Sequence, residues 1–129
     1  MKVREFLIAG AALMATGIIL GAFGAHQLKE LIPEDSLTSF KTGVLYQLIH
    51  GVALLALGNV ARHDERIDRI AGRLMYVGCI LFSGSIYLLS PRFLLGIEGA
   101  ASFLGPITPI GGSLMIIGWL LFLYRLIRD

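Results

Sequence analysis

The stretch that decides the fold is Phe6–Ala25, FLIAGAALMATGIILGAFGA, which carries no charged residue. Its length, about 20 residues, is what one transmembrane helix requires. A cleavable signal peptide is the alternative, because Lys2 and Arg4 precede the run and the small residues around Ala22–Gly24 could be cleaved. The apolar part of a signal peptide spans only about 7–15 residues. We therefore expect a retained transmembrane helix over residues 6–25.

Three further apolar runs follow and indicate three more transmembrane helices, at about residues 43–61, 70–89 and 109–127. Of the 129 residues, 56% are hydrophobic and 16% are charged, whereas soluble domains carry about 25% charge. The four runs and their connections take up nearly the whole chain. The sequence therefore predicts an all-α integral membrane protein: residues 1–129 form a single membrane domain, a four-transmembrane-helix bundle.

Turn and cap residues set the expected helix ends. Pro33–Ser36 resembles a helix start with Asp35 or Ser36 as N-cap, so the second helix is expected to begin near residue 36, before the membrane. Ser90-Pro91 predicts the end of the third helix. Thr108-Pro109 resembles an N-cap followed by proline at the first helical position. No structure is assigned to residues 92–102.

Basic residues predict the orientation in the membrane. One side carries eight of the 11 Lys and Arg residues: Lys2, Arg4, Arg62, Arg66, Arg69, Arg73, Arg125 and Arg128. The other side carries three: Lys29, Lys41 and Arg92. Cytoplasmic loops are enriched in Lys and Arg, so both termini are expected in the cytoplasm. No basic stripe interleaved with aromatic residues is present, so no nucleic-acid partner is expected.

Polar residues inside the runs gather toward the outer side and form the candidate ligand-binding site. Its members are His26, Tyr46, Gln47, His50, Ser83, Ser85, Tyr87 and Thr108. Helical spacing places Gly43, Tyr46, Gln47 and His50 on one face, and Cys79, Ser83 and Tyr87 on another, while Ser85 points elsewhere. We expect a polar pocket between the second and third helices, capped by residues 105–112. The alternative is a hydrogen-bond network that only holds the helices together.

Histidines are the main candidates for chemistry. His50 is the strongest, since a titratable ring inside a membrane helix is rare; its alternative role is a neutral ring hydrogen-bonded to a neighbouring helix. His26 and His50 together could hold haem or a metal, but two histidines without a nearby cysteine or acid do not make a closed metal site. No metal and no cofactor are therefore expected. His63, in a charged loop, is expected to be solvated.

Glycines mark the expected helix contacts: Gly10, Gly17, Gly21 and Gly24 in the first run, and Gly111 and Gly118 in the last. Stripes of small residues let helix backbones approach closely. We favour packing within the bundle; packing between protomers is the alternative.

Catalytic motifs are absent: the chain has no GxSxG, Walker loop, HExxH, CxxC or paired carboxylates. No catalytic residue and no enzyme activity are therefore predicted. No Asp or Glu lies within the four runs, which argues against a proton-coupled cation exporter, since such proteins use an intramembrane carboxylate.

Five motifs resemble one family throughout the chain. They are GAFGAH (residues 21–26), TGVLYQLIH (42–50), FSGSIYLL (82–89), GPITPIGG (105–112) and GW (118–119). In this order they closely resemble the YgdD-like, also called YwdK-like, family of small bacterial inner-membrane proteins of unknown function, which has a small vertebrate transmembrane relative. The resemblance implies a four-helix multipass protein of the bacterial plasma membrane and supplies no mechanism. The segment 91–103 looks longer than the family's usual link.

Three functional hypotheses follow. The first is a non-enzymatic membrane protein that binds a small ligand or lipid, or supports a membrane partner protein. The second is a channel or transporter for a small solute or proton, formed as a homo-oligomer because four helices enclose little space. The third is a haem or quinone redox protein that uses His26 and His50.

Overall fold

The computed structural model describes residues 2–60 and 66–129. These residues form helices α1 (Val3–His26), α2 (Glu34–Val60), α3 (Arg66–Leu89), α4 (Arg92–Leu95) and α5 (Ala101–Arg128), with short 3-10 helices η1 (Leu28–Glu30) and η2 (Glu98–Ala100). No strand occurs in this part of the chain. The predicted end of the second helix at Ala61, and the loop residues Arg62, His63, Asp64 and Glu65, lie outside the described residues.

Within the described ranges, four helical segments are long and apolar enough to cross a membrane: Val3–Glu30, Glu34–Val60, Arg66–Leu89 and Glu98–Arg128. The predicted all-α architecture with four membrane-spanning helices is confirmed. Side chains on the outward faces of these helices are largely apolar; Ile19, Leu120 and Ile127, for example, are exposed. In a bilayer such side chains contact lipid.

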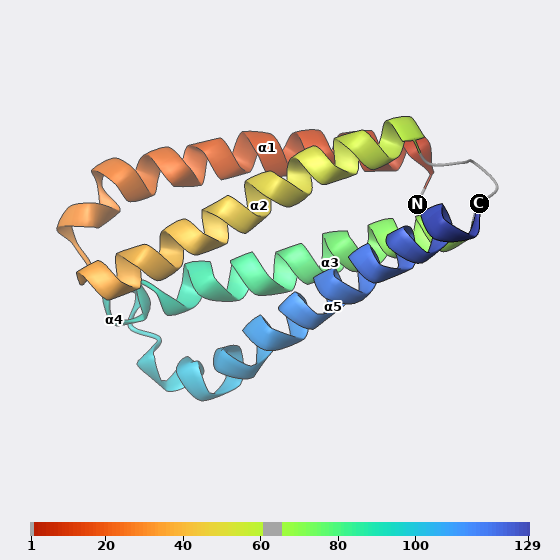
Figure 1. Cartoon of the computed structure of the whole chain (residues 1–129). Helices are drawn as coiled ribbons and strands as arrows, with labels where there is room; N and C mark the ends of the chain where they lie inside the picture. The colour runs from red at the N-terminus through yellow and green to blue at the C-terminus, as the bar shows by residue number, and fades with distance from the viewer. Residues whose placement is uncertain (1, 61–65) are drawn as a thin grey trace.

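The four long helices are arranged as two hairpins. α1 packs along α2, α3 packs along α5, and contacts between α2 and α3 join the pairs. Both termini lie at one end of the bundle, which we call the terminal end (Figure 1). The opposite end, called the distal end, holds η1, α4 and η2 (Figure 1). α2 and α3 are thus the central helices, and α1 and α5 flank them.

The last helix begins earlier than predicted. α5 starts at Ala101, so Thr108 and Pro109 lie inside it and do not form its start, and Pro106 also lies within the helix. Proline has a φ value that a helix accepts and removes one backbone hydrogen bond, a loss that transmembrane helices tolerate. The sequence analysis interpreted Thr108-Pro109 as the start of the last helix. A proline can also lie inside a transmembrane helix that begins earlier, as it does in α5.

The start of α2 and the segment 92–102 also lie at the distal end. α2 begins at Glu34, and the Leu37 amide donates to the Pro33 carbonyl, so Asp35 and Ser36 lie in the first helical turn. Residues 92–102, to which no structure was assigned, contain α4 and η2. α4 ends at Leu95 and is capped by Gly96, whose φ of 70° is in the left-handed region. Glycine adopts that region without the steric cost of a Cβ.

Glycines allow the backbones of paired helices to touch. A Cβ placed on Gly10 of α1 would lie 2.8 Å from the Gly51 carbonyl oxygen of α2. A Cβ on Gly111 of α5 would lie 2.6 Å from the Gly78 carbonyl oxygen of α3. The remaining glycines predicted to pack also face a neighbouring helix of the same chain: Gly17, Gly21 and Gly24 face α2, and Gly118 faces α3. Neither stripe is left open for a second protomer.

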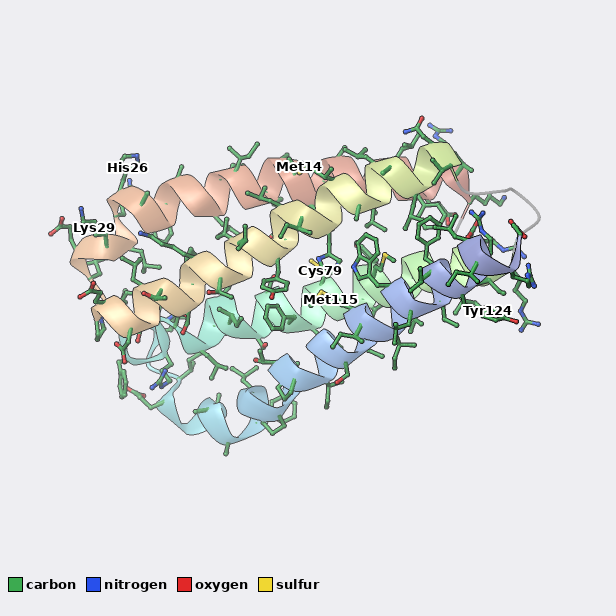
Figure 2. All side chains as sticks on the ribbon, in the orientation of Figure 1. Met14, His26, Lys29, Cys79, Met115 and Tyr124 are labelled. Carbon is green, nitrogen blue, oxygen red and sulfur yellow. The ribbon has the colours of Figure 1, made fainter. Side chains whose placement is uncertain are left out.

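Apolar packing is densest in the half of the bundle near the terminal end. Phe6 of α1 is 1% exposed, and its ring lies directly over Gly72 of α3. The buried cluster around it draws on all four long helices and comprises Phe6, Ala9, Leu13, Leu54, Leu57, Met75, Cys79 and Met115. The cluster reaches the middle of the bundle, where Cys79 and Met115 are labelled in Figure 2.

A buried ion pair joins α3 to α5 at the terminal end and was not predicted. Arg125 Nε donates to Asp68 Oδ1 over 2.8 Å, and Arg125 Nη2 donates to Asp68 Oδ2 over 2.7 Å. The two side chains are 5% and 0% exposed. Asp68 precedes the apolar run 70–89, but α3 begins at Arg66 and carries the carboxylate into the helix pair. The terminal half of the bundle therefore contains a bidentate charge pair as well as apolar packing.

Arg125→Met is expected to destabilise the protein strongly, because it removes both charge-assisted hydrogen bonds from a buried carboxylate. Breaking a buried pair from one side costs about 3–5 kcal/mol. Thermal unfolding in mild detergent measures the effect. Arg4→Met, which removes an exposed arginine near the same end, is the control and should change the midpoint little. Equal midpoints for the two variants would contradict the structural role of the pair.

Candidate functional site

Gln47 is the centre of a hydrogen-bond network that links three helices. Its side chain is buried on α2, and Nε2 donates to the Leu13 carbonyl oxygen (2.9 Å) and to Thr16 Oγ1 (2.7 Å) of α1. Its Oε1 accepts from the hydroxyl of Tyr87 on α3. Both ends of the amide are therefore occupied by protein groups.

The buried serines tie α3 to its two neighbours. Ser83 Oγ donates to the Gly43 carbonyl oxygen of α2 over 2.7 Å. Ser85 points to the other side of α3, as its spacing indicates, and its hydroxyl shares a hydrogen bond with Thr108 Oγ1 of α5. Each pair satisfies a polar group that would otherwise be buried unpaired.

His50 is held in a neutral form by partners on both ring nitrogens. Nδ1 lies 2.8 Å from the Tyr46 carbonyl oxygen, which can only accept, so Nδ1 carries the proton. Nε2 accepts from Trp119 Nε1 of α5 over 3.0 Å. The ring has no nitrogen left for a metal, haem iron or a travelling proton. The sequence analysis did not identify Trp119 as the partner; the sequence signal was the only tryptophan of the chain, in the last apolar run.

The two remaining candidates lie apart from this network. His26 is exposed at the end of α1, and its side chain points away from the other helices (Figure 2). It is not brought together with His50. Tyr46 is half-exposed, and its ring lies against Phe82 of α3 with ring centroids 4.9 Å apart. Within residues 2–60 and 66–129, no group of three or more His, Cys, Asp or Glu side chains could hold a metal ion.

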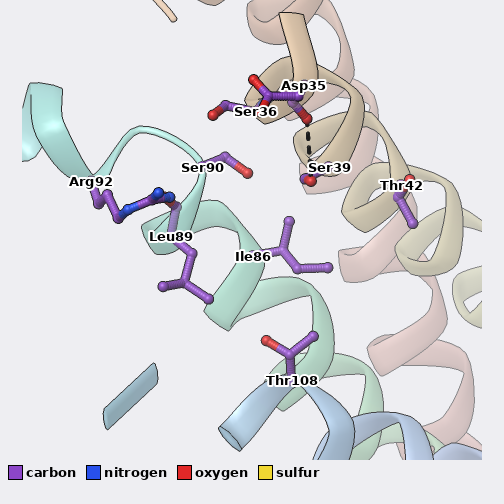
Figure 3. Close-up of a pocket in the computed structure, with 9 residues that line it drawn as sticks. All are labelled: Asp35, Ser36, Ser39, Thr42, Ile86, Leu89, Ser90, Arg92 and Thr108. Atoms are coloured by element: carbon purple, nitrogen blue, oxygen red, sulfur yellow. Dashed lines mark hydrogen bonds between the residues drawn. The ribbon is translucent and has the colours of Figure 1, made fainter. Parts of the chain in front are cut away.

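An open hollow lies at the distal end, between α2, the end of α3 and α5. This distal pocket has a volume of about 460 Å³ and is shown in Figure 3. It is lined by Asp35, Ser36, Ser39, Thr42, Ile86, Leu89, Ser90, Arg92 and Thr108. Its volume falls within the ~300–1,000 Å³ typical of small-molecule sites.

Ser90 is the anomaly in this pocket. It is 5% exposed, and its hydroxyl is the buried side-chain polar group that finds no hydrogen-bond partner among the described residues. Figure 3 shows the side chain pointing toward α2, where Ser39 lies. Buried hydroxyls in proteins are almost always paired, and an unpaired one costs about 1–3 kcal/mol. An unpaired group that faces a hollow indicates a partner that occupies the hollow.

The other pocket hydroxyls are oriented by their own helix. Ser39 Oγ donates to the Asp35 carbonyl oxygen, and Thr42 Oγ1 donates to the Thr38 carbonyl oxygen. Because a hydroxyl has one proton and two lone pairs, these two oxygens face the pocket as hydrogen-bond acceptors.

Two opposite charges line the same pocket. Asp35 is exposed at the start of α2, and Arg92 is half-buried just after α3. One guanidinium nitrogen of Arg92, Nη1, donates to the Leu89 carbonyl oxygen over 2.9 Å. No ion pair between Asp35 and Arg92 occurs among the described residues. Asp35 Oδ1 accepts from the Ser36 amide over 2.9 Å, so Oδ2 and the remaining guanidinium N–H groups are available to a ligand.

Of the nine lining residues, the sequence analysis proposed only Thr108 as a site residue. It interpreted Asp35 or Ser36 as the helix cap and Ser90 as part of the signal that ends the third helix. It used Arg92 only as one of the basic residues that predict the orientation in the membrane. A signal was nevertheless present, because Asp35, Ser39, Thr42 and Tyr46 follow one another at helical spacing and form one polar face at the start of α2.

A second hollow lies nearer the middle of the bundle, lined by the same three helices. This apolar groove has a volume of about 380 Å³. It is lined by Tyr46, Ile49, His50, Phe82, Gly112, Met115, Ile116 and Trp119. Since the ring nitrogens of His50 and Trp119 bond to each other, the groove presents carbon surfaces for most of its area.

Comparison with known proteins assigns the chain to a family. A family model described as "Protein of unknown function (DUF423)" matches residues 20–112, a range that includes every residue lining the distal pocket. The chain belongs to the DUF423 family. No solved structure matches it significantly.

Curated relatives of this DUF423 chain are named as membrane proteins. UPF0382 membrane protein YwdK of Bacillus subtilis is 41% identical over 97% of this chain and 98% of its own. UPF0382 membrane protein SAB0533 of Staphylococcus aureus is 41% identical over 93% of each chain. A UPF0382 membrane protein of Haemophilus influenzae is 36% identical over 83% of this chain and 81% of its own. The resemblance to the YwdK-like family is confirmed: this is a multipass helical membrane protein of a family without an assigned activity, and none of these names is that of an enzyme.

Proposed function

We propose that this chain is a non-enzymatic protein of the bacterial plasma membrane that binds a polar ligand in the distal pocket. The observation that carries the proposal is the buried, unpaired hydroxyl of Ser90 facing a hollow of about 460 Å³. The charged side chains of Asp35 and Arg92, which line the same pocket, and the acceptor oxygens of Ser39 and Thr42 support it.

Binding fits this arrangement better than catalysis. A serine nucleophile needs a base within hydrogen-bond reach, but both ring nitrogens of His50 are engaged by Tyr46 and Trp119. The deeper polar residues Gln47, Ser83 and Ser85 are likewise bonded to neighbouring helices. Their contacts support a role in holding the helices together, and this favours the distal pocket as the ligand site.

The proposed orientation sets both termini in the cytoplasm and the distal pocket on the outer side. Support comes from the basic residues, because eight of the 11 Lys and Arg residues belong to the terminal end and its connections. Cytoplasmic segments of bacterial membrane proteins carry such an excess. A ligand would therefore reach the pocket from the outer leaflet or the space beyond it.

Ser90→Ala and Ser83→Ala form a matched pair that tests the ligand site. In protein stripped of bound material, Ser90→Ala should raise the free energy of unfolding by about 1 kcal/mol, because it removes an unpaired buried hydroxyl. Ser83→Ala should lower it by about the same amount, because it removes the bond to Gly43. Thermal unfolding midpoints in mild detergent measure both changes.

Adding back a total extract of the host membrane should then stabilise the wild type more than Ser90→Ala, because the ligand pairs the serine hydroxyl. Ser83→Ala should respond to the extract as the wild type does. A stripped Ser90→Ala protein that is less stable than the wild type, or an extract that stabilises neither, would contradict the proposal.

Cysteine labelling tests the orientation. Cys79 is the single cysteine of the chain and is buried, so Cys79→Ala gives a background for new cysteines. Lys29→Cys at the distal end should react with a membrane-impermeant maleimide in intact spheroplasts. Lys2→Cys at the terminal end should react only after lysis. The opposite pattern would overturn the proposed orientation.

A further inference from the structure

We propose that the distal pocket and the apolar groove together bind one membrane phospholipid whose headgroup carries a phosphate and a primary amine. The headgroup lies in the pocket, and one acyl chain lies in the groove. This inference rests on the proposed function of the distal pocket and names its ligand.

The two hollows are consecutive on the same three helices. On α2, Thr42 of the pocket is one turn from Tyr46 of the groove. On α3, Ile86 is one turn from Phe82, and the same step on α5 leads from Thr108 to Gly112. A molecule with a polar end and an apolar tail would therefore span the two neighbouring hollows, with its polar end at the distal end of the bundle.

The length of this span matches one leaflet. At roughly 1.5 Å per residue, Asp35 at the top and His50 at the bottom are separated by about 22 Å along α2. Half of a bilayer, including its headgroup region, is about 20–22 Å thick. A lipid of the outer leaflet would thus place its headgroup at Asp35 and end its chain near His50.

Charge in the pocket selects the headgroup. The free N–H groups of Arg92 suit a phosphate, which guanidinium binds through two parallel hydrogen bonds. The Asp35 carboxylate and the acceptor oxygens of Ser39 and Thr42 suit a donor with N–H bonds, as in a primary ammonium. A quaternary ammonium has no N–H to offer these acceptors. The Ser90 hydroxyl gains the partner that it lacks when it donates to a phosphate oxygen.

The groove suits an acyl chain because its polar atoms are engaged. His50 and Trp119 bond to each other through their ring nitrogens, and Gly112 leaves the wall of α5 open at this level. The side chains at its rim are partly exposed: Tyr46 is 39%, Ile49 47% and Ile116 61% exposed. α5 also diverges from α3 toward the distal end (Figure 1). The groove therefore opens sideways, toward the surrounding lipid.

Native mass spectrometry of delipidated protein tests the inference. The probes are palmitoyl-oleoyl phosphatidylethanolamine, the matching phosphatidylglycerol, the matching diacylglycerol, and free O-phosphoethanolamine. The phosphatidylethanolamine should bind at least about tenfold more tightly than the other three, a difference that corresponds to ~1.4 kcal/mol. Tight binding requires both the headgroup and the chain, so neither fragment alone should replace the whole lipid.

Variants separate the two parts of the site. Arg92→Gln and Asp35→Asn should each weaken phosphatidylethanolamine binding about tenfold through the headgroup. Gly112→Leu should do so by filling the groove, and its Cβ is tolerated because it would lie 3.7 Å from the Phe82 ring. The controls are Lys29→Gln, which removes a distal charge that does not line the pocket, and Gly105→Leu, where a Cβ on the same helix meets nothing within 4 Å. Both controls should bind as the wild type does.

Three results would overturn the inference, and they differ in what else they overturn. Equal binding of phosphatidylglycerol would show that the assigned headgroup is wrong. O-phosphoethanolamine binding as tightly as the lipid, with Gly112→Leu unchanged, would leave a polar-ligand site and remove the lipid. The proposed function of the pocket fails as well if no probe binds. It also fails if neither Arg92→Gln nor Ser90→Ala changes the binding of any probe.

Discussion

The bundle depends on one constraint: a polar group within the hydrocarbon layer must find its partner inside the protein. Gln47, His50, Ser83 and Ser85 each meet this requirement through a bond to a different helix. These bonds fix the rotation of α2 and α3 against α1 and α5. These four residues, which the sequence analysis proposed for a ligand site, thus also connect the helices of the bundle.

The same constraint divides the molecule along its length. The terminal end carries a bidentate Asp68–Arg125 pair beside a close-packed apolar core. Inter-helix hydrogen bonds follow toward the distal end. Beyond them, α5 diverges from α3 (Figure 1), and polar side chains of α2 and of the residues just after α3 line the distal pocket (Figure 3). In this region the buried hydroxyl of Ser90 has no hydrogen-bond partner among the described residues.

Run length and composition were enough to predict four spanning helices, because a bilayer demands about 20 apolar residues wherever a helix crosses it. The candidate site was predicted only in part. Spacing placed Tyr46, Gln47 and His50 near one another on α2, but it could not reveal that Trp119 donates a hydrogen bond to His50, since that depends on how distant helices pair. Pro109 led to a wrong predicted start for α5. Asp35 was interpreted as a helix cap and Ser90 as a stop signal, because single-sequence rules describe helix ends and not the hollows between helices.

A crystal structure grown from a lipid mesophase doped with phosphatidylethanolamine tests the central claim most directly, because it shows both the internal bonds and the hollow. The account predicts phosphate density within hydrogen-bond distance of Ser90 and Arg92, with chain density running past Tyr46 to Trp119. His50 should remain bonded to Trp119. A closed pocket, with the Ser90 hydroxyl bonded to another protein group and α5 packed against α2, would contradict the account.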